Sequence, residues 1–181
     1  MPLGRSRARA PASETHDGTD LASYSRRTKL LYIPTRSTCD EVTLTQDNRK
    51  NANGIINGGQ RRYIERNETD VVAADPFTGD VKNKLHVTYP DNSAALTTAG
   101  GLLITGFTDG TVAAYDDTSL AQLWKFNVGS GINAPPMTFE VGGRQYLAIQ
   151  SGLNRNAQNI NSMTPELREM RNHTMLFVFG L

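Results

Sequence analysis

The sequence predicts an all-β protein, and three observations lead to that prediction. Short apolar or alternating runs follow one another from Val71 to Gln150, and each has the length and composition of a β-strand. Glycine, aspartate, asparagine and proline stand between these runs, where hairpin turns require them. Two of the segments also repeat along the chain, as described below. The only convincing helix is a short one near the C-terminus, at Thr164–Asn172.

The composition indicates a globular chain. It has 181 residues, of which 38% are hydrophobic and 20% are charged, enough for one domain with a core. The net charge of +1 gives no case for a nucleic-acid or membrane surface. No apolar run approaches the roughly 18 residues of a membrane span. Cys39 is the only cysteine, which excludes an intrachain disulfide, and the three histidines lack the spacing of a zinc site.

Residues 1–17 are predicted to form a disordered basic tail, and residues 18–181 the folded part. Arg5, Arg7 and Arg9 are not followed by an apolar stretch, so the segment does not read as a secretory signal. From the sequence as written, the expected location is therefore cytoplasmic.

The elements follow in order from Leu30. Leu30–Pro34 is an apolar strand ended by proline, and a polar segment rich in Asn and Gly follows as a surface excursion with one strand at Arg62–Glu65. The remaining strands are expected at Val71–Asp75, Val81–Val87, Leu102–Gly106, Thr111–Asp116, Gln122–Val128, Pro136–Val141, Arg144–Gln150 and Met175–Leu181.

Two local signals support this order of elements. Gly142 and Gly143 form a two-residue hairpin between their strands, because both residues of such a turn need positive φ. The expected helix has Thr164 at the N-cap and Pro165 at its first position. Glu166 lies in its first turn and Arg171 near its C-terminal end, where each charge complements the helix dipole.

Two segments repeat with an offset of 41 residues. "VVAADPFTGDVKNKL" aligns with "TVAAYDDTSLAQLWKF", which places Asp75 on Asp116 and Asn83 on Trp124, the only tryptophan. A period near 40–45 residues with about four strands per unit is typical of a β-propeller blade. The sequence therefore predicts a partial propeller.

Each residue type in the repeat has a physical role. An aspartate at a strand end caps the following turn, and a glycine supplies positive φ within it. A tryptophan on the next strand can lie between adjacent blades and donate its N–H to a backbone carbonyl. Asp75, Gly79, Asp116 and Trp124 are therefore the predicted blade-docking residues. Each copy is incomplete, because Asn83 replaces the Trp in the first and Leu120 the Gly in the second.

The fragments "TAGGL", "DGTVAAYD" with "LWKF", and "GSGINAPPMTF" with "GRQYLAIQSG" closely resemble the C-terminal blades of PQQ-dependent (quinoprotein) alcohol and methanol dehydrogenases. "SYSRRTKL" resembles a strand that in the family reads close to Ser-Tyr-Ser-Pro-x-Thr-Gly-Leu, so that Arg26 and Lys29 replace Pro and Gly. The resemblance covers roughly Gly18 to Leu181 and is strongest over Leu96–Gly152.

The resemblance implies an eight-bladed propeller, of which this chain would hold about two to three four-stranded blades. It implies oxidation of primary alcohols or aldehydes with PQQ and a calcium or lanthanide ion, a cytochrome c-type acceptor, and a periplasmic location. The family's catalytic base and metal ligands lie in earlier blades. The resemblance therefore assigns no catalytic and no metal-binding residue to this chain.

The resemblance also indicates candidates for one edge of the cofactor chamber. Asp20 stands where the family has an asparagine that faces the cofactor. Asn92, Ser93 and Ala94 stand where the family's backbone borders the quinone. The competing interpretation of these three residues is a turn that leads into a strand.

Two hypotheses of different classes remain open. The chain is either a piece of a quinoprotein oxidoreductase, inactive as a lone chain, or a non-catalytic β-sheet module with a binding or structural role. Two to three blades leave unpaired strand edges and exposed faces between blades, which favour self-association of the chain. The acidic residues Asp109, Asp116 and Asp117 do not match a calcium-loop spacing, and turn capping accounts for Asp109 and Asp116.

Overall fold

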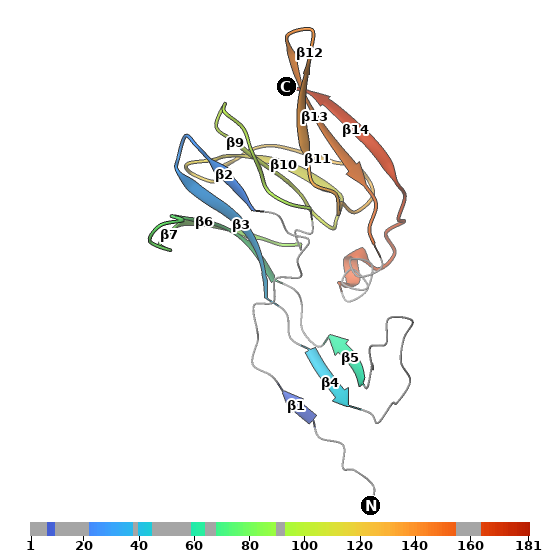
Figure 1. Cartoon of the computed structure of the whole chain (residues 1–181). Coiled ribbons are helices and arrows are strands. Elements are labelled where there is room, and N and C mark those ends of the chain that lie inside the picture. Colours follow the sequence, from blue (N-terminus) through green and yellow to red (C-terminus); the bar gives the residue numbers. More distant parts are fainter. Residues whose placement is uncertain are drawn as a thin grey trace, which may run out of the picture.

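The structure is a computed structural model that describes residues 7–9, 22–37, 40–44, 59–63, 68–89, 93–154 and 164–181. These residues form antiparallel strands and one short 3-10 turn (Figure 1). The predicted all-β class and the partial propeller are confirmed.

Three sheets make up the propeller part. The first sheet has the order β2 (Ser23–Ser25), β3 (Leu30–Ser37), β6 (Glu68–Ala74), β7 (Val81–Val87). The second has β8 (Leu96–Thr97), β9 (Leu102–Gly106), β10 (Thr111–Asp116), β11 (Gln122–Asn127). The third has β12 (Met137–Val141), β13 (Arg144–Ser151), β14 (Met175–Gly180). Each is a meander, as in a propeller blade.

A separate small sheet lies toward the N-terminus (Figure 1). It pairs β4 (Asp40–Leu44) with β1 (Arg7–Arg9) on one side and with β5 (Gly59–Tyr63) on the other. Strand β1 falls within the segment 1–17 that the sequence assigns to a tail, and the boundary at residue 18 stays a prediction. Strand β5 begins three residues before the expected Arg62–Glu65, because its register is set by pairing with β4.

In the second sheet, strands β9 and β10 are buried on both faces. Its side chains alternate with the strand period of two, so that neighbours along β9 and β10 point to opposite sides. One apolar cluster joins it to the first sheet and contains Tyr32, Val71, Ala73, Leu103, Phe107, Ala113 and Tyr115. The other joins it to the third sheet and contains Ile104, Val112, Ala114, Ile132, Leu147 and Ile149. The core therefore lies between the sheets.

The two repeats fold into the same turn. In the first, the Asp75 carboxylate accepts the amide of Phe77 at 2.8 Å, and Gly79 takes φ 77°. In the second, the Asp116 carboxylate accepts the amides of Thr118 and Ser119 at 3.1 and 2.8 Å. Leu120 occupies the glycine position with φ 58°, which is uncommon for a residue with a side chain. The turn therefore keeps a positive φ at this position in both repeats, although leucine replaces glycine in the second.

The repeats also share a β-bulge. The register shifts between Ala73 and Ala74 in the first sheet, and between Ala114 and Tyr115 in the second. The shift places Asn83 opposite Ala73 and Trp124 opposite Ala114. Turn and bulge recur at the same 41-residue offset, which confirms the repeat.

Strand β3 continues through Pro34 to Ser37, beyond the expected end at the proline. The reason is that β2 pairs only with Leu30–Tyr32, so Pro34 has a neighbouring strand on one side alone. A proline is tolerated where no ladder hydrogen bond is required of it.

The C-terminal helix is shorter than the sequence predicts. Only Pro165–Leu167 form a 3-10 turn, and Thr164 at its N-cap makes no side-chain cap bond. Further along, the Asn172 side chain binds both the amide and the carbonyl of Leu153, at 2.8 and 3.0 Å. These bonds hold Asn172 against the end of β13, where a continued helix would not place it.

Gly131 provides a test of the packing between the second and third sheets. A Cβ at this position would lie 2.5 Å from the carbonyl oxygen of Thr108 and 2.6 Å from a methyl group of Leu153. Because a backbone carbonyl cannot move away, we expect Gly131→Ala to lower the free energy of unfolding by about 1–3 kcal/mol. Urea unfolding followed by far-UV circular dichroism measures this change.

Gly100→Ala is the matched control, since its added Cβ meets only the Thr98 hydroxyl at 3.8 Å. Equal unfolding midpoints for the two variants would contradict the close packing at Gly131.

Candidate functional site

A buried carboxylate lies at the seam between the first and second sheets. Asp117, in the turn after β10, has 0% exposure. Its Oδ2 accepts hydrogen bonds from Ser25 Oγ at 3.0 Å and from Arg27 Nε at 3.4 Å, both from the first sheet. Arg27 Nη2 forms an ion pair with Oδ1. The charge of Asp117 is thus compensated from the neighbouring sheet, as a buried carboxylate requires.

The main chain of Asp117 is tied to the same seam. Its amide donates to the Gly101 carbonyl at 2.9 Å. The hydroxyl of the fully buried Tyr32 donates to the Asp117 carbonyl, and Tyr32 is in turn bonded to the Thr28 hydroxyl at 2.9 Å. The main-chain amide and carbonyl of Asp117 are therefore both hydrogen-bonded to residues outside its own turn.

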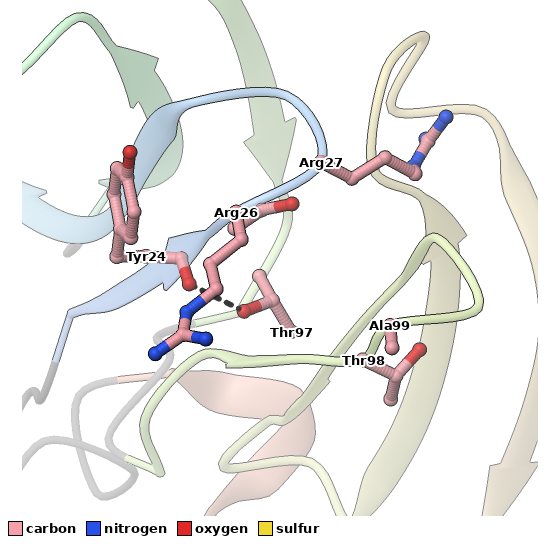
Figure 2. A pocket seen from close by; sticks show the side chains of 7 residues that line it. Tyr24, Arg26, Arg27, Thr97, Thr98 and Ala99 are labelled. Carbon is pink, nitrogen blue, oxygen red and sulfur yellow. Dashed lines mark hydrogen bonds between the residues drawn. The ribbon is translucent and has the colours of Figure 1, made fainter.

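A cleft of about 450 Å³ opens beside this seam, between the β2–β3 turn and the β8–β9 turn (Figure 2). Its lining residues are Tyr24, Ser25, Arg26, Arg27, Thr97, Thr98 and Ala99. The Thr97 hydroxyl bridges the two inner strands, because it donates to the Tyr24 carbonyl at 3.2 Å and bonds Ser23 Oγ at 2.8 Å. Arg26 and Arg27 leave the turn in different directions in Figure 2.

The structure describes two of the four residues predicted to border the cofactor, Ser93 and Ala94. Asp20 and Asn92 are outside the described residues. Ser93 is 1% exposed and its hydroxyl donates to the Ala134 carbonyl at 2.7 Å. Ala94 is 2% exposed and its carbonyl accepts from Thr105 Oγ1 at 3.0 Å. Ser93 and Ala94 are thus buried and hydrogen-bonded within the chain, and the cofactor-edge roles of Asp20, Asn92, Ser93 and Ala94 stay predictions.

Trp124 joins the second sheet to the third. Its ring meets Phe179 of β14 edge-on, with ring centroids 5.2 Å apart at 71°. Phe126 also contacts Phe179 at 5.4 Å. The indole remains 39% exposed, and within the described part of the chain its N–H meets no hydrogen-bond acceptor. Trp124 therefore contacts the third sheet through its ring, and among the described residues it lacks the expected hydrogen bond to a backbone carbonyl.

Asn83, at the position equivalent to Trp124, also reaches the next sheet. Its amide Nδ2 donates at 3.3 Å to the carbonyl of Thr118, in the turn between β10 and β11. Sequence reasoning treated this asparagine as a departure from the repeat. In the structure it links the first sheet to the second, as Trp124 links the second to the third.

The other acidic residues of the turns serve local bonds. Hydrogen bonds from the Ser119 amide and hydroxyl, and from the Thr118 amide, hold the pKa of the Asp116 carboxyl below its usual value. The Asp109 carboxylate accepts the amide and the hydroxyl of Thr111 at 2.9 and 2.7 Å. In the ranges that the structure describes, no group of three His, Cys, Asp or Glu residues could hold a metal ion.

Sequence reasoning missed the Arg27–Asp117 pair. The available signal was the second aspartate of the Asp116–Asp117 doublet, because capping the turn uses only the first. Nothing local identifies its partner, which lies 90 residues earlier in the chain.

The family described as PQQ, glucose/ethanol/alcohol dehydrogenase, β-propeller domain, matches residues 56–147, half of the chain. The chain belongs to this family. Its relatives are quinoprotein alcohol dehydrogenases, so it is part of an oxidoreductase family whose cofactor is PQQ. The resemblance stated from the sequence is confirmed.

Three similar proteins illustrate the relationship. A quinoprotein ethanol dehydrogenase of Pseudomonas putida is 34% identical over 132 residues, 72% of this chain and 21% of that protein. A 1-butanol dehydrogenase (cytochrome c) of Thauera butanivorans is 30% identical over 159 residues, 80% of this chain and 23% of that protein. A europium-containing methanol dehydrogenase superposes with a TM-score of 0.77 at 25% identity, covering 90% of this chain and 32% of that one.

The chain thus spans about a fifth of the length of the curated relatives that it matches. In the part of the chain that the structure describes, no helix has the length and hydropathy that crossing a membrane would need.

The Arg27–Asp117 pair leads to an asymmetric prediction. Arg27→Met leaves a charged Asp117 without its cation in a buried seam, and we expect a loss of about 3 kcal/mol in unfolding free energy. Asp117→Asn leaves Arg27, whose side chain is 47% exposed and can be solvated, so we expect a loss of only about 1 kcal/mol. Urea unfolding at fixed protein concentration gives both values.

Arg26→Met is the control, because Arg26 is exposed and a surface change of this kind shifts stability by about 0.5 kcal/mol or less. If Arg27→Met lowers the free energy of unfolding no more than Arg26→Met does, the ion pair does not stabilise the seam.

Proposed function

We propose that this chain supplies blades to a PQQ-dependent alcohol-oxidising propeller, and that it does not oxidise alcohols by itself. The observation that carries the proposal is the recurrence of one turn and one bulge at a 41-residue offset, in sheets packed face to face. Such units bury their apolar faces only against neighbouring units. The match to about a fifth of each relative supports a role as part of a larger assembly.

In this proposal the residues of the chain act as a scaffold. PQQ carries the redox chemistry when it is bound, and the protein supplies orientation and electrostatics. By the family resemblance, we place the catalytic base and the calcium or lanthanide ligands in earlier blades, outside this chain, and keep Asp20, Asn92, Ser93 and Ala94 as the candidates for one edge of the cofactor chamber. Asp75, Gly79, Asp116 and Trp124 are assigned to blade docking.

The substrates and partners are proposed by analogy with the relatives. Their names include ethanol, methanol and 1-butanol dehydrogenases, and one is named with cytochrome c. We infer that the complete propeller takes a small alcohol or aldehyde, passes electrons to a cytochrome c-type acceptor and works in the periplasm.

The alternative is a non-catalytic module with a binding or structural role. Its support comes from the outermost strands, which expose large apolar side chains: Leu123, Phe126, Leu176 and Val178 are between 47% and 64% exposed. Strand β11 is exposed along its whole length. Open strand edges with apolar residues favour association with another chain.

The proposal predicts no turnover by the purified chain. The assay is dye-linked oxidation of ethanol, methanol and 1-butanol with added PQQ and either calcium or a lanthanide ion. The Pseudomonas putida quinoprotein ethanol dehydrogenase serves as the positive control under the same conditions. Turnover by the 181-residue chain would contradict the proposal, because the base and the metal ligands would then be in this chain.

Light scattering on the same preparation tests the expected self-association. A blade fragment with open faces and unpaired strand edges is expected to associate with itself. A monodisperse monomer with a cooperative thermal transition would contradict that expectation.

A further inference from the structure

Two neighbouring arginines in the cleft beside the seam differ in how their charges are compensated. Arg27 is paired with Asp117 and also donates from Nη2 to Thr118 Oγ1 at 2.8 Å. Arg26 is exposed, and its guanidinium has no hydrogen bond or ion pair with any residue that the structure describes. No carboxylate is among the residues that line the cleft. Arg26 therefore gives the cleft one uncompensated positive charge.

The opposite wall of the cleft adds a hydroxyl donor. Thr98 Oγ1 accepts the amide of Leu102 at 3.1 Å, an arrangement that leaves its own O–H hydrogen available to a ligand. Of the remaining hydroxyl groups of the cleft, that of Thr97 donates to the Tyr24 carbonyl and that of Ser25 donates to Asp117, whereas the half-exposed Tyr24 hydroxyl stays available. The side-chain groups that remain available, on Arg26, Thr98 and Tyr24, can all donate hydrogen bonds.

We propose that this cleft is an anion site in which the Arg26 guanidinium holds an oxyanion group, a carboxylate or a phosphate, while Thr98 lines the opposite wall. A guanidinium presents parallel N–H donors whose spacing matches two oxygens of either group. A volume of about 450 Å³ exceeds what a lone oxyanion fills, so the group can belong to a small organic acid or phosphate ester.

The site is independent of the predicted cofactor edge. The described candidates Ser93 and Ala94 precede the inner strand β8, whereas Thr98 directly follows it. Thr98 and these two residues therefore lie at opposite ends of β8. Arg26 also replaces the proline of the family strand, which makes the charge a property of this chain.

The test is calorimetric titration of the full chain with sodium acetate and with inorganic phosphate, at an ionic strength held constant with sodium chloride. We expect saturable binding of at least one anion, and the tighter one identifies the group. Arg26→Gln should weaken that binding at least tenfold, because a charge-assisted hydrogen bond is lost. Arg26→Lys keeps the charge but loses the planar donors, so its affinity for the anion should lie between those of the original chain and Arg26→Gln.

Arg144→Gln is the matched control, since Arg144 is an exposed arginine on β13 in the third sheet. It should bind the anion as the original chain does. A second measurement is the rate at which phenylglyoxal modifies each arginine, read by mass spectrometry, which also works on an associated chain. The bound anion should slow modification of Arg26 and leave Arg144 unchanged.

The proposal is overturned if neither anion binds saturably. It is equally overturned if Arg26→Gln binds as tightly as the original chain, or if the anion protects Arg26 and Arg144 alike.

Discussion

A buried charge controls how the first two sheets meet. Asp117 has no exposed surface, and burying a carboxylate costs several kcal/mol unless it is paired. Its donors, Ser25 and Arg27, come from the first sheet, while its main chain is fixed to Gly101 of the second. The turn that contains Asp117 is therefore stable in this position only when the first sheet is in place.

The apolar packing also makes the second sheet depend on the sheets beside it. The second sheet has buried side chains on both faces, one set against the first sheet and one against the third. A sheet of this kind cannot fold alone in water, because either open face would expose its core. The links from Asn83 to Thr118 and from Trp124 to Phe179 then repeat the connection from one sheet to the next. Family membership and the structure thus agree on a scaffold of blades.

Much of this fold could be predicted from the sequence, because hairpins are local. Val81–Val87, Leu102–Gly106 and Thr111–Asp116 are strands with the predicted bounds. Contacts between distant segments could not be predicted. The Arg27–Asp117 pair joins residues 90 positions apart, and β8 is too short to show a pattern. The hydrogen bond from Ser93 to the Ala134 carbonyl joins residues 41 positions apart, and no local signal in the sequence reveals it.

Hydrogen exchange at the Thr97 amide tests the central claim most directly, that the seam between the first two sheets is a fixed part of the fold. This amide belongs to β8 of the second sheet and donates at 3.0 Å to Ser23 Oγ of the first sheet, whereas Ala113 lies in the middle of strand β10 and serves as the reference. If the seam opens only on global unfolding, the Thr97 amide exchanges as slowly as that of Ala113. Exchange at Thr97 that is much faster than at Ala113 would show that the sheets separate on their own, and would contradict the account.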